Sequence, residues 1–348
     1  MNRRVLGVVL LSIGIVLVVA GLVLMLAIVP GMKQLPDDVN TTRTYEGTAP
    51  VMFDPATFQF MKDLKIDLTR HFEAEATDSG VALVKEEQSL SSQGQSIQEL
   101  LKRYAIDRKT MEASQKYPAS WAELAGFFPR QGLIIGWPIG TEKKDYQGWS
   151  DDYRSTVTLS FSGEVQHERA KIKTYYFTAG SGPQAINADY VKALGLPLEI
   201  PKEQFTALVG QTELSDMVKR FLPLVLQQLP GDTVPLAYYY EYEGEYWIDP
   251  KTGVLIDTKK HELRKVGLPD EAIAGTPLAN LPEEQRAALR VPVSDFTYWG
   301  SDQSVQDAKK DAEDAGNQIT LYGTTLPIVA IVAGAVLGLI GIFLVLRK

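Results

Sequence analysis

The sequence predicts an α+β protein in which two terminal transmembrane helices flank a β-rich extracytoplasmic domain with a helical insert. Two long uncharged apolar runs lie at the ends of the chain. Between them are three blocks with strand-like alternation and one stretch with helical periodicity. Because the strand blocks contain their own turn signals, we expect one or more curved antiparallel sheets.

The two apolar runs are each long enough to cross a bilayer. Residues 5–29 and 323–346 contain no charged side chain, and about 20 apolar residues span the hydrocarbon core. The first run is longer than the apolar core of a cleaved signal peptide, and no small-x-small site follows it, which favours an uncleaved anchor. Two such runs at opposite ends disfavour the alternative of buried core helices.

Basic residues at the outer end of each run predict the orientation. Two arginines precede the first run, and an arginine and a lysine follow the second. Lysine and arginine near helix ends favour the cytoplasmic side of a membrane. We therefore expect a two-pass protein of the cell membrane with cytoplasmic termini at residues 1–4 and 347–348 and with residues 30–301 outside.

The composition of the middle of the chain excludes several classes of function. Four of the 35 basic residues flank the apolar runs, so the remainder carries 12 fewer basic than acidic residues, of which there are 43. This acidic balance argues against nucleic acid and against electrostatic binding to anionic lipid. The absence of cysteine excludes disulfides, thiol catalysis and thiolate metal sites. We expect no metal and no cofactor.

The first strand block begins near Tyr45 and has a turn signal at residues 78–80. A polar connector over 91–103 leads into a predicted helical turn over 97–104. Before this block, Asn40 begins a glycosylation sequon, which matters only in a cell that glycosylates.

The second strand block covers residues 155–178, with a predicted hairpin turn at Ser162-Gly163. A helical insert then occupies residues 186–229. Pro201 suits the first position of one helix, Thr212 can cap the next, and Pro223 should bend it.

The third strand block covers residues 234–264 and contains the clearest turn motif. Asp249-Pro250 opens a type I turn, and Gly253 can take the left-handed conformation that closes the hairpin. After a proline-rich stretch, residues 302–322 form an alanine- and charge-rich juxtamembrane helix that leads into the second apolar run.

A weak internal repeat has the form hydrophobic-Asp-x-x-Thr at residues 53–57, 106–110 and 248–252. Duplication of a β unit, with halves over 45–180 and 181–300, would explain it. Reuse of a good turn sequence would explain it equally well.

Motifs that carry chemistry are hard to find. His167 and His261 each precede a glutamate but lack the second histidine of a zinc protease, so we read both as solvated strand residues. The chain has no nucleophile elbow, phosphate loop or dinucleotide fingerprint. Adjacent acids such as Asp151-Asp152 are expected to face water, with a glycosidase-like pair as the alternative. We therefore expect no catalytic residue and a protein that is not an enzyme.

Aromatic residues are concentrated in two segments, 121–149 and 238–247. They are expected to form the core of a twisted sheet. The alternative is the lining of an apolar groove that is covered by the helix around residues 221–226. The candidates for this groove are Trp137, Trp149, Phe221, Leu222, Val225, Tyr240 and Trp247.

Several stretches together resemble a bacterial family that is often called PorA-family porins and is best known in actinobacteria. They are the two apolar ends and residues 45–49, 105–110, 137–146 and 246–253, of which Gly-Thr-Glu-Lys-Lys-Asp-Tyr at 140–146 is the most specific. The resemblance covers nearly the whole chain, implies a channel- or porin-related role and brings no established catalytic residues. Residues 247–253 also resemble a hairpin of LolA- and RseB-type lipoprotein carriers, in which a curved sheet surrounds an apolar cavity.

These observations lead to two main hypotheses. The first is an envelope protein, not an enzyme, whose β domain binds a lipid, another apolar ligand or a lipidated partner. The second is a scaffold that holds other envelope proteins through residues 302–322 and the membrane helices. An apolar cavity inside the sheet would favour the first, and a filled interior the second. A porin-related role and a hydrolase are the remaining alternatives.

Overall fold

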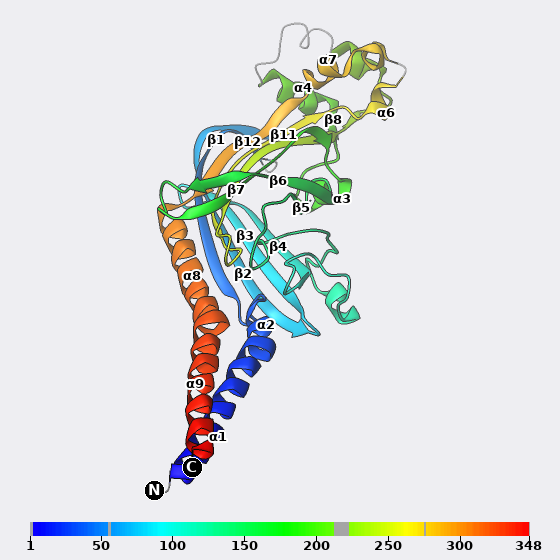
Figure 1. The fold of residues 1–348 in the computed structure, drawn as a ribbon. Helices are drawn as coiled ribbons and strands as arrows, with labels where there is room; N and C mark the ends of the chain where they lie inside the picture. Colours follow the sequence, from blue (N-terminus) through cyan, green and yellow to red (C-terminus); the bar gives the residue numbers. More distant parts are fainter. Residues whose placement is uncertain (1–2, 55–56, 212–222, 275, 348) are drawn as a thin grey trace.

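The structure is a computed structural model that describes residues 3–347 apart from 55–56, 212–222 and 275. A curled antiparallel sheet of ten strands forms the body of the protein, two long helices leave it at one end, and short helices cap the other end (Figure 1). The predicted mixture of helix and curved antiparallel sheet is confirmed at this level.

The ten strands lie in the order β4-β3-β2-β1-β12-β11-β10-β7-β6-β5, so the first and last strands of the chain pair in the interior of the sheet. Strands from both halves of the proposed repeat therefore share one sheet. The strands are β1 (Asn40–Asp54), β2 (Gln59–Asp78), β3 (Val81–Ser92), β4 (Gln95–Asp107), β5 (Tyr146–Ser150), β6 (Ser155–Gln166), β7 (Lys173–Ala185), β10 (Ala237–Ile248), β11 (Leu255–Gly267) and β12 (Val291–Gly300).

The segment between β4 and β5 connects the two edges of the sheet. Isolated bridges join Ile106 to Ala113, Glu112 to Leu133, and Leu133 to Gly148. A short 3-10 helix (Ala119–Glu123) lies within this segment. Because the segment contacts both edge strands, it lies across the open side of the curled sheet and helps to enclose the concave face.

Two predictions about local structure are wrong. The predicted helical turn over 97–104 belongs to β4, where Lys102 pairs with Glu86 and Tyr104 with Val84, because pairing with a neighbouring strand overrides a local helical preference. The predicted turn at Ser162-Gly163 is an irregularity inside β6, and the chain reverses at residues 167–172 instead. The turn signals at 78–80 and 249–253 are confirmed, with φ of +86° at Gly80 and +74° at Gly253.

The repeated Asp-x-x-Thr motif has a common local role. The Asp107 side chain accepts hydrogen bonds from the backbone N–H groups of Lys109 and Thr110, and Asp249 does the same for residues 251 and 252. Asp54 accepts from the Thr57 hydroxyl. Reuse of a turn sequence accounts for these contacts, and an ancestral duplication stays a prediction.

The cap is a mixture of short helices and strands. Within the predicted helical insert, β8 is a strand that pairs with β9 beyond the insert, and Pro201 stands immediately before α4. Thr212, Phe221 and Leu222 lie outside the described residues. The cap elements are α3 (Ala188–Ala193), β8 (Glu199–Pro201), α4 (Lys202–Gly210), a helical stretch over 223–228, β9 (Thr233–Pro235), α6 (Asp270–Ile273), a 3-10 helix (Pro277–Asn280) and α7 (Glu283–Ala287).

The two ends of the chain form long helices that lie side by side (Figure 1). The first comprises α1 (Arg3–Val23), a π-helical turn (Leu24–Ile28) and α2 (Val29–Met32). The second comprises α8 (Asp302–Thr320), a π-helical turn (Leu321–Thr325) and α9 (Leu326–Leu346). Both helices are long and apolar enough to span a membrane. The predicted helix over 302–322 is confirmed.

Glycines allow α1 and α9 to pack closely. A Cβ atom at Gly14 would lie 2.5 Å from the Gly334 carbonyl oxygen, and one at Gly7 would lie 2.9 Å from that of Gly341. Large apolar side chains cover the remaining surface, for example Val16, 65% exposed, and Leu339, 67% exposed. Such a surface is unfavourable in water and suits hydrocarbon.

Candidate functional site

Two adjoining cavities lie within the curled sheet. The first has a volume of about 200 Å³ and is lined largely by charged and aromatic side chains, and we call it the charged compartment. The second has a volume of about 390 Å³ and is lined mainly by apolar side chains, and we call it the mouth. The two cavities adjoin because they share the lining residues Arg70, Ile135, Gly136, Trp137 and Leu255.

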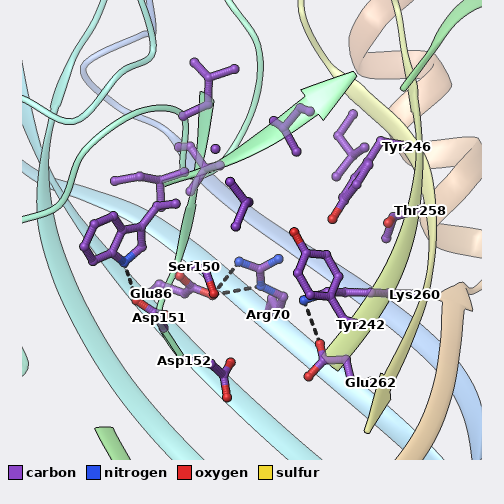
Figure 2. A pocket seen from close by; sticks show the side chains of 18 of the residues that line it. Arg70, Glu86, Ser150, Asp151, Asp152, Tyr242, Tyr246, Thr258, Lys260 and Glu262 are labelled. Carbon is purple, nitrogen blue, oxygen red and sulfur yellow. Dashed lines mark hydrogen bonds and ion pairs between the residues drawn. The ribbon is translucent and has the colours of Figure 1, made fainter. Parts of the chain in front are cut away.

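The strand alternation explains how charged side chains reach the interior. Lys260, Glu262 and Arg264 alternate along β11, so all three lie on one face of the sheet. Glu262 stands opposite Tyr242 of β10, and Arg264 stands opposite Tyr240. On the other side of the interior, Arg70 of β2 and Glu86 of β3 point toward this group (Figure 2).

Each of these buried charges has an opposite charge within reach. Arg70 lies 2.7 Å from Glu86, which is 1% exposed. Arg264 lies 2.9 Å from Asp152 and 3.0 Å from Glu262. Lys260 is 2.9 Å from Glu262, so the carboxylate of Glu262 is shared by two cations.

The loop between β5 and β6 contributes two further carboxylates. Asp151 lies 2.8 Å from the Lys102 ammonium and 3.1 Å from the Arg130 guanidinium, and it accepts a hydrogen bond from the indole N–H of Trp149 at 2.8 Å. Asp152 is only 6% exposed. The prediction that these two acids face water is therefore wrong, because cations from distant parts of the chain compensate their charges.

The pKa values follow from burial and these partners. Burial raises the pKa of Glu262, but the charges of Lys260 and Arg264 outweigh this effect and lower it to about 2. Burial is likewise outweighed at Glu86, whose pKa is lowered by Arg70. At Asp152 burial prevails over the attraction of Arg264 and raises the pKa. The network thus holds Glu86 and Glu262 as charged partners of the neighbouring cations.

The mouth lies at the end of the sheet from which the two long helices leave. Met32 from α2 and Ile319 from α8 line it together with Phe72 of β2 and Val254 of the β10–β11 turn. At its edge, Arg43 lies 2.6 Å from Asp311 of α8. The mouth therefore opens beside the apolar helices and not beside the cap.

The turn motif shapes the wall between the two cavities. Gly253 has φ of +74°, and a Cβ atom there would lie 2.2 Å from the carbonyl oxygen of Trp137. The Trp137 backbone N–H donates to the Gly253 carbonyl at 3.2 Å. Only glycine permits this approach, which fixes the β10–β11 turn against residues 136–137.

The structure separates the residues predicted for an apolar groove. Trp137 lines both cavities, Trp149 lines the charged compartment, and Gly253 lines the mouth. Tyr240 is 1% exposed and stacks on Tyr242 with ring centroids 5.5 Å apart. Of the other groove and turn candidates, Val225 packs in the cap, and Trp247 packs against His167 and Tyr176. Asp249 and Pro250 lie in the turn, and none of these four lines either cavity. Phe221 and Leu222 lie outside the described residues.

The histidines have structural partners. His167 is 5% exposed, and its Nε2 lies 3.0 Å from the carboxylate of Asp257, so the prediction of a solvated residue is wrong for it. His261 is half-buried on β11, 2.9 Å from Asp295. Among the residues that the structure describes, no group of three or more histidine, aspartate or glutamate side chains could hold a metal ion.

The sequence does not predict the charged compartment, because the residues that form its ion pairs are far apart along the chain. Arg264 and Asp152 are 112 positions apart. The one local signal is the pattern of β11, which has charged residues on both faces over 259–265, where a half-buried strand would have them on one face.

Comparisons with known proteins agree with the resemblance seen in the sequence. The family model described as Porin PorA matches residues 6–343. A protein named Porin PorA from Corynebacterium resistens is 22% identical over 326 residues, which cover 82% of this chain and 77% of that protein. Since the family model matches almost from end to end, this chain belongs to the PorA porin family.

Proposed function

We propose that this protein is anchored in the cell membrane by both terminal helices and that its β domain binds a lipid or another amphiphile through the mouth. The exposed apolar surface of α1 and α9 supports the anchoring. The basic residues outside each helix support cytoplasmic termini and an extracytoplasmic domain. Nothing in the proposal requires catalysis.

The observation that carries the proposal is the position and character of the mouth. It is an apolar cavity of about 390 Å³, within the range of small-molecule sites. It opens beside the point where the helices enter the membrane, so an acyl chain could pass from the bilayer into the sheet without crossing water. Transfer of the chain between two apolar surroundings avoids the cost of hydrating it.

Two other functions remain as alternatives. A porin-related role is supported by the family and by the continuity of the mouth with a charge-lined compartment, and single-channel recording in planar bilayers would test it. A scaffold is supported by the exposed polar face of α8, and crosslinking in whole cells followed by mass spectrometry would test that. The apolar lining of the mouth favours amphiphile binding over both.

The test uses the full chain in nanodiscs with a photoactivatable fatty acid as the probe. Ala315 lies on α8 and lines the mouth, so Ala315→Trp should fill the cavity and weaken labelling roughly tenfold, equivalent to about 1.4 kcal/mol of binding. Asn317→Trp is the matched control, because Asn317 is exposed on the same helix and does not line the mouth. Absence of labelling in the folded unmodified protein, or equal labelling of both variants, would refute the proposal.

A further inference from the structure

Trp137 presents a buried hydrogen-bond donor at the junction of the two cavities. Its side chain is 5% exposed, and its ring packs against Phe177 and Tyr246 with centroids 5.3 and 5.8 Å away. Among the described residues, no atom accepts a hydrogen bond from its Nε1–H. A buried donor without an acceptor costs about 1–3 kcal/mol, and the indole nitrogen can only donate.

A second buried donor lies deeper, in the charged compartment. Arg130 is 5% exposed, and its guanidinium is held over the Tyr104 ring at 4.2 Å and beside Asp151 at 3.1 Å. Its Nε–H also has no acceptor among the residues that the structure describes. Trp137 and Arg130 thus each present to the compartment lining a donor for which the described residues supply no acceptor.

The charge around the compartment has the matching sign. Four cationic side chains and four carboxylates line it among the described residues, and Lys102, which pairs with Asp151 from outside the lining, adds a fifth cation. This leaves one positive charge in the ion-pair network when all its groups are ionised. Arg70 lines both cavities, as Trp137 does, and its ion pair within the described residues is with Glu86. A cation and an unpaired donor thus stand together where the apolar lining ends.

We propose that this junction binds the anionic oxygen head, carboxylate or phosphate, of an amphiphile whose apolar chain lies in the mouth. Trp137 donates one hydrogen bond to the head, Arg70 supplies the charge, and Arg130 donates from within the compartment. A charge-assisted hydrogen bond to such an oxygen is stronger than a neutral one. The inference rests on the proposed function and specifies the chemical class of its ligand.

The test compares head groups on one chain. Full-length protein in nanodiscs is labelled with the photoactivatable fatty acid, and hexadecanoate, hexadecyl phosphate and hexadecyltrimethylammonium compete with the label. The two anions should compete at least tenfold better than the cation. Acetate and inorganic phosphate at the same concentrations should not compete, which separates a lipid head from a free anion.

Trp137→Phe removes the N–H and keeps a ring in the same packing, and it should reduce the preference for the anions several-fold without abolishing labelling. Phe177→Leu is the control, because it alters the same aromatic cluster and leaves the donor in place. Three outcomes would overturn the head-group assignment. They are equal competition by all three amphiphiles, competition by inorganic phosphate without an acyl chain, and an unchanged preference for anions in Trp137→Phe. Loss of all labelling in the unmodified protein would instead refute the proposed function.

Discussion

The charged compartment and the mouth lie next to each other on the concave face of one sheet, but their side chains are stabilised in different ways. In the compartment, Arg264 and Glu262 are satisfied by partners within the fold. In the mouth, apolar side chains such as Phe72 and Ile319 face a cavity. The difference indicates that the compartment is chiefly held by the protein itself, whereas the mouth would gain stability if an apolar group filled it.

The largest expected effect comes from removing the cation that two carboxylates share. Arg264→Met should leave Asp152 without its ion pair and Glu262 with Lys260 alone. Breaking a buried pair in this way costs about 3–5 kcal/mol, to be measured by denaturant unfolding. Lys259→Met on the same strand is the control, because the Lys259 side chain is 57% exposed. Similar losses in both variants would show that the compartment is not held by its ion pairs.

Acid should weaken the compartment before it affects the apolar packing of the mouth. The pKa of Glu262 is lowered from 4.5 to about 2 and that of Glu86 is also lowered. Their contribution to stability is therefore complete above about pH 4.5 and is lost as the pH falls through the folded-state pKa toward 2. The raised pKa of Asp152 acts in the opposite direction and offsets part of the loss.

The measurement is the denaturant midpoint between pH 6 and pH 2.5, in the unmodified protein and in Glu262→Gln. The unmodified protein should lose stability steadily below pH 4.5, and the variant should start lower and change less. A midpoint that stays constant over this range would contradict the assigned ion pairs.

The sequence predicts those features that depend on local residues, and it does not predict those that depend on contacts between distant strands. The terminal helices and the turn at Asp249–Gly253 follow from local properties, namely an uninterrupted apolar run and the conformational freedom of glycine. Strand β4 was misread because its conformation depends on pairing with β3. Likewise, Arg70 and Glu86 look like solvated strand residues until the sheet curls and places them inside. Trp137 could be named as a candidate, but the junction where it lies could not.

A substitution at the boundary between the two cavities should separate binding of the acyl chain in the mouth from recognition of the anionic head at the compartment. Gly136 lines both cavities, and a Cβ atom there would meet its nearest neighbour at 3.5 Å, an ordinary contact. Gly136→Leu should cost about 1–3 kcal/mol of stability, retain acyl labelling and lose the preference for anionic heads. Gly182→Leu, where nothing lies within 4 Å, should change neither property. Retention of the preference in Gly136→Leu would show that the head does not reach the compartment.

The smallest effect is expected at the edge of the mouth, where an ion pair joins α8 to the sheet. Arg43 and Asp311 are 2.6 Å apart, closer than Arg264 and Asp152, but the Asp311 side chain is 52% exposed. Water screens such a pair, and its contribution is about 0–1 kcal/mol. Asp311→Asn should therefore shift the denaturant midpoint far less than Arg264→Met does. A comparable shift would mean that α8 is held to the sheet mainly through this contact, and that the mouth depends on charge as much as the compartment does.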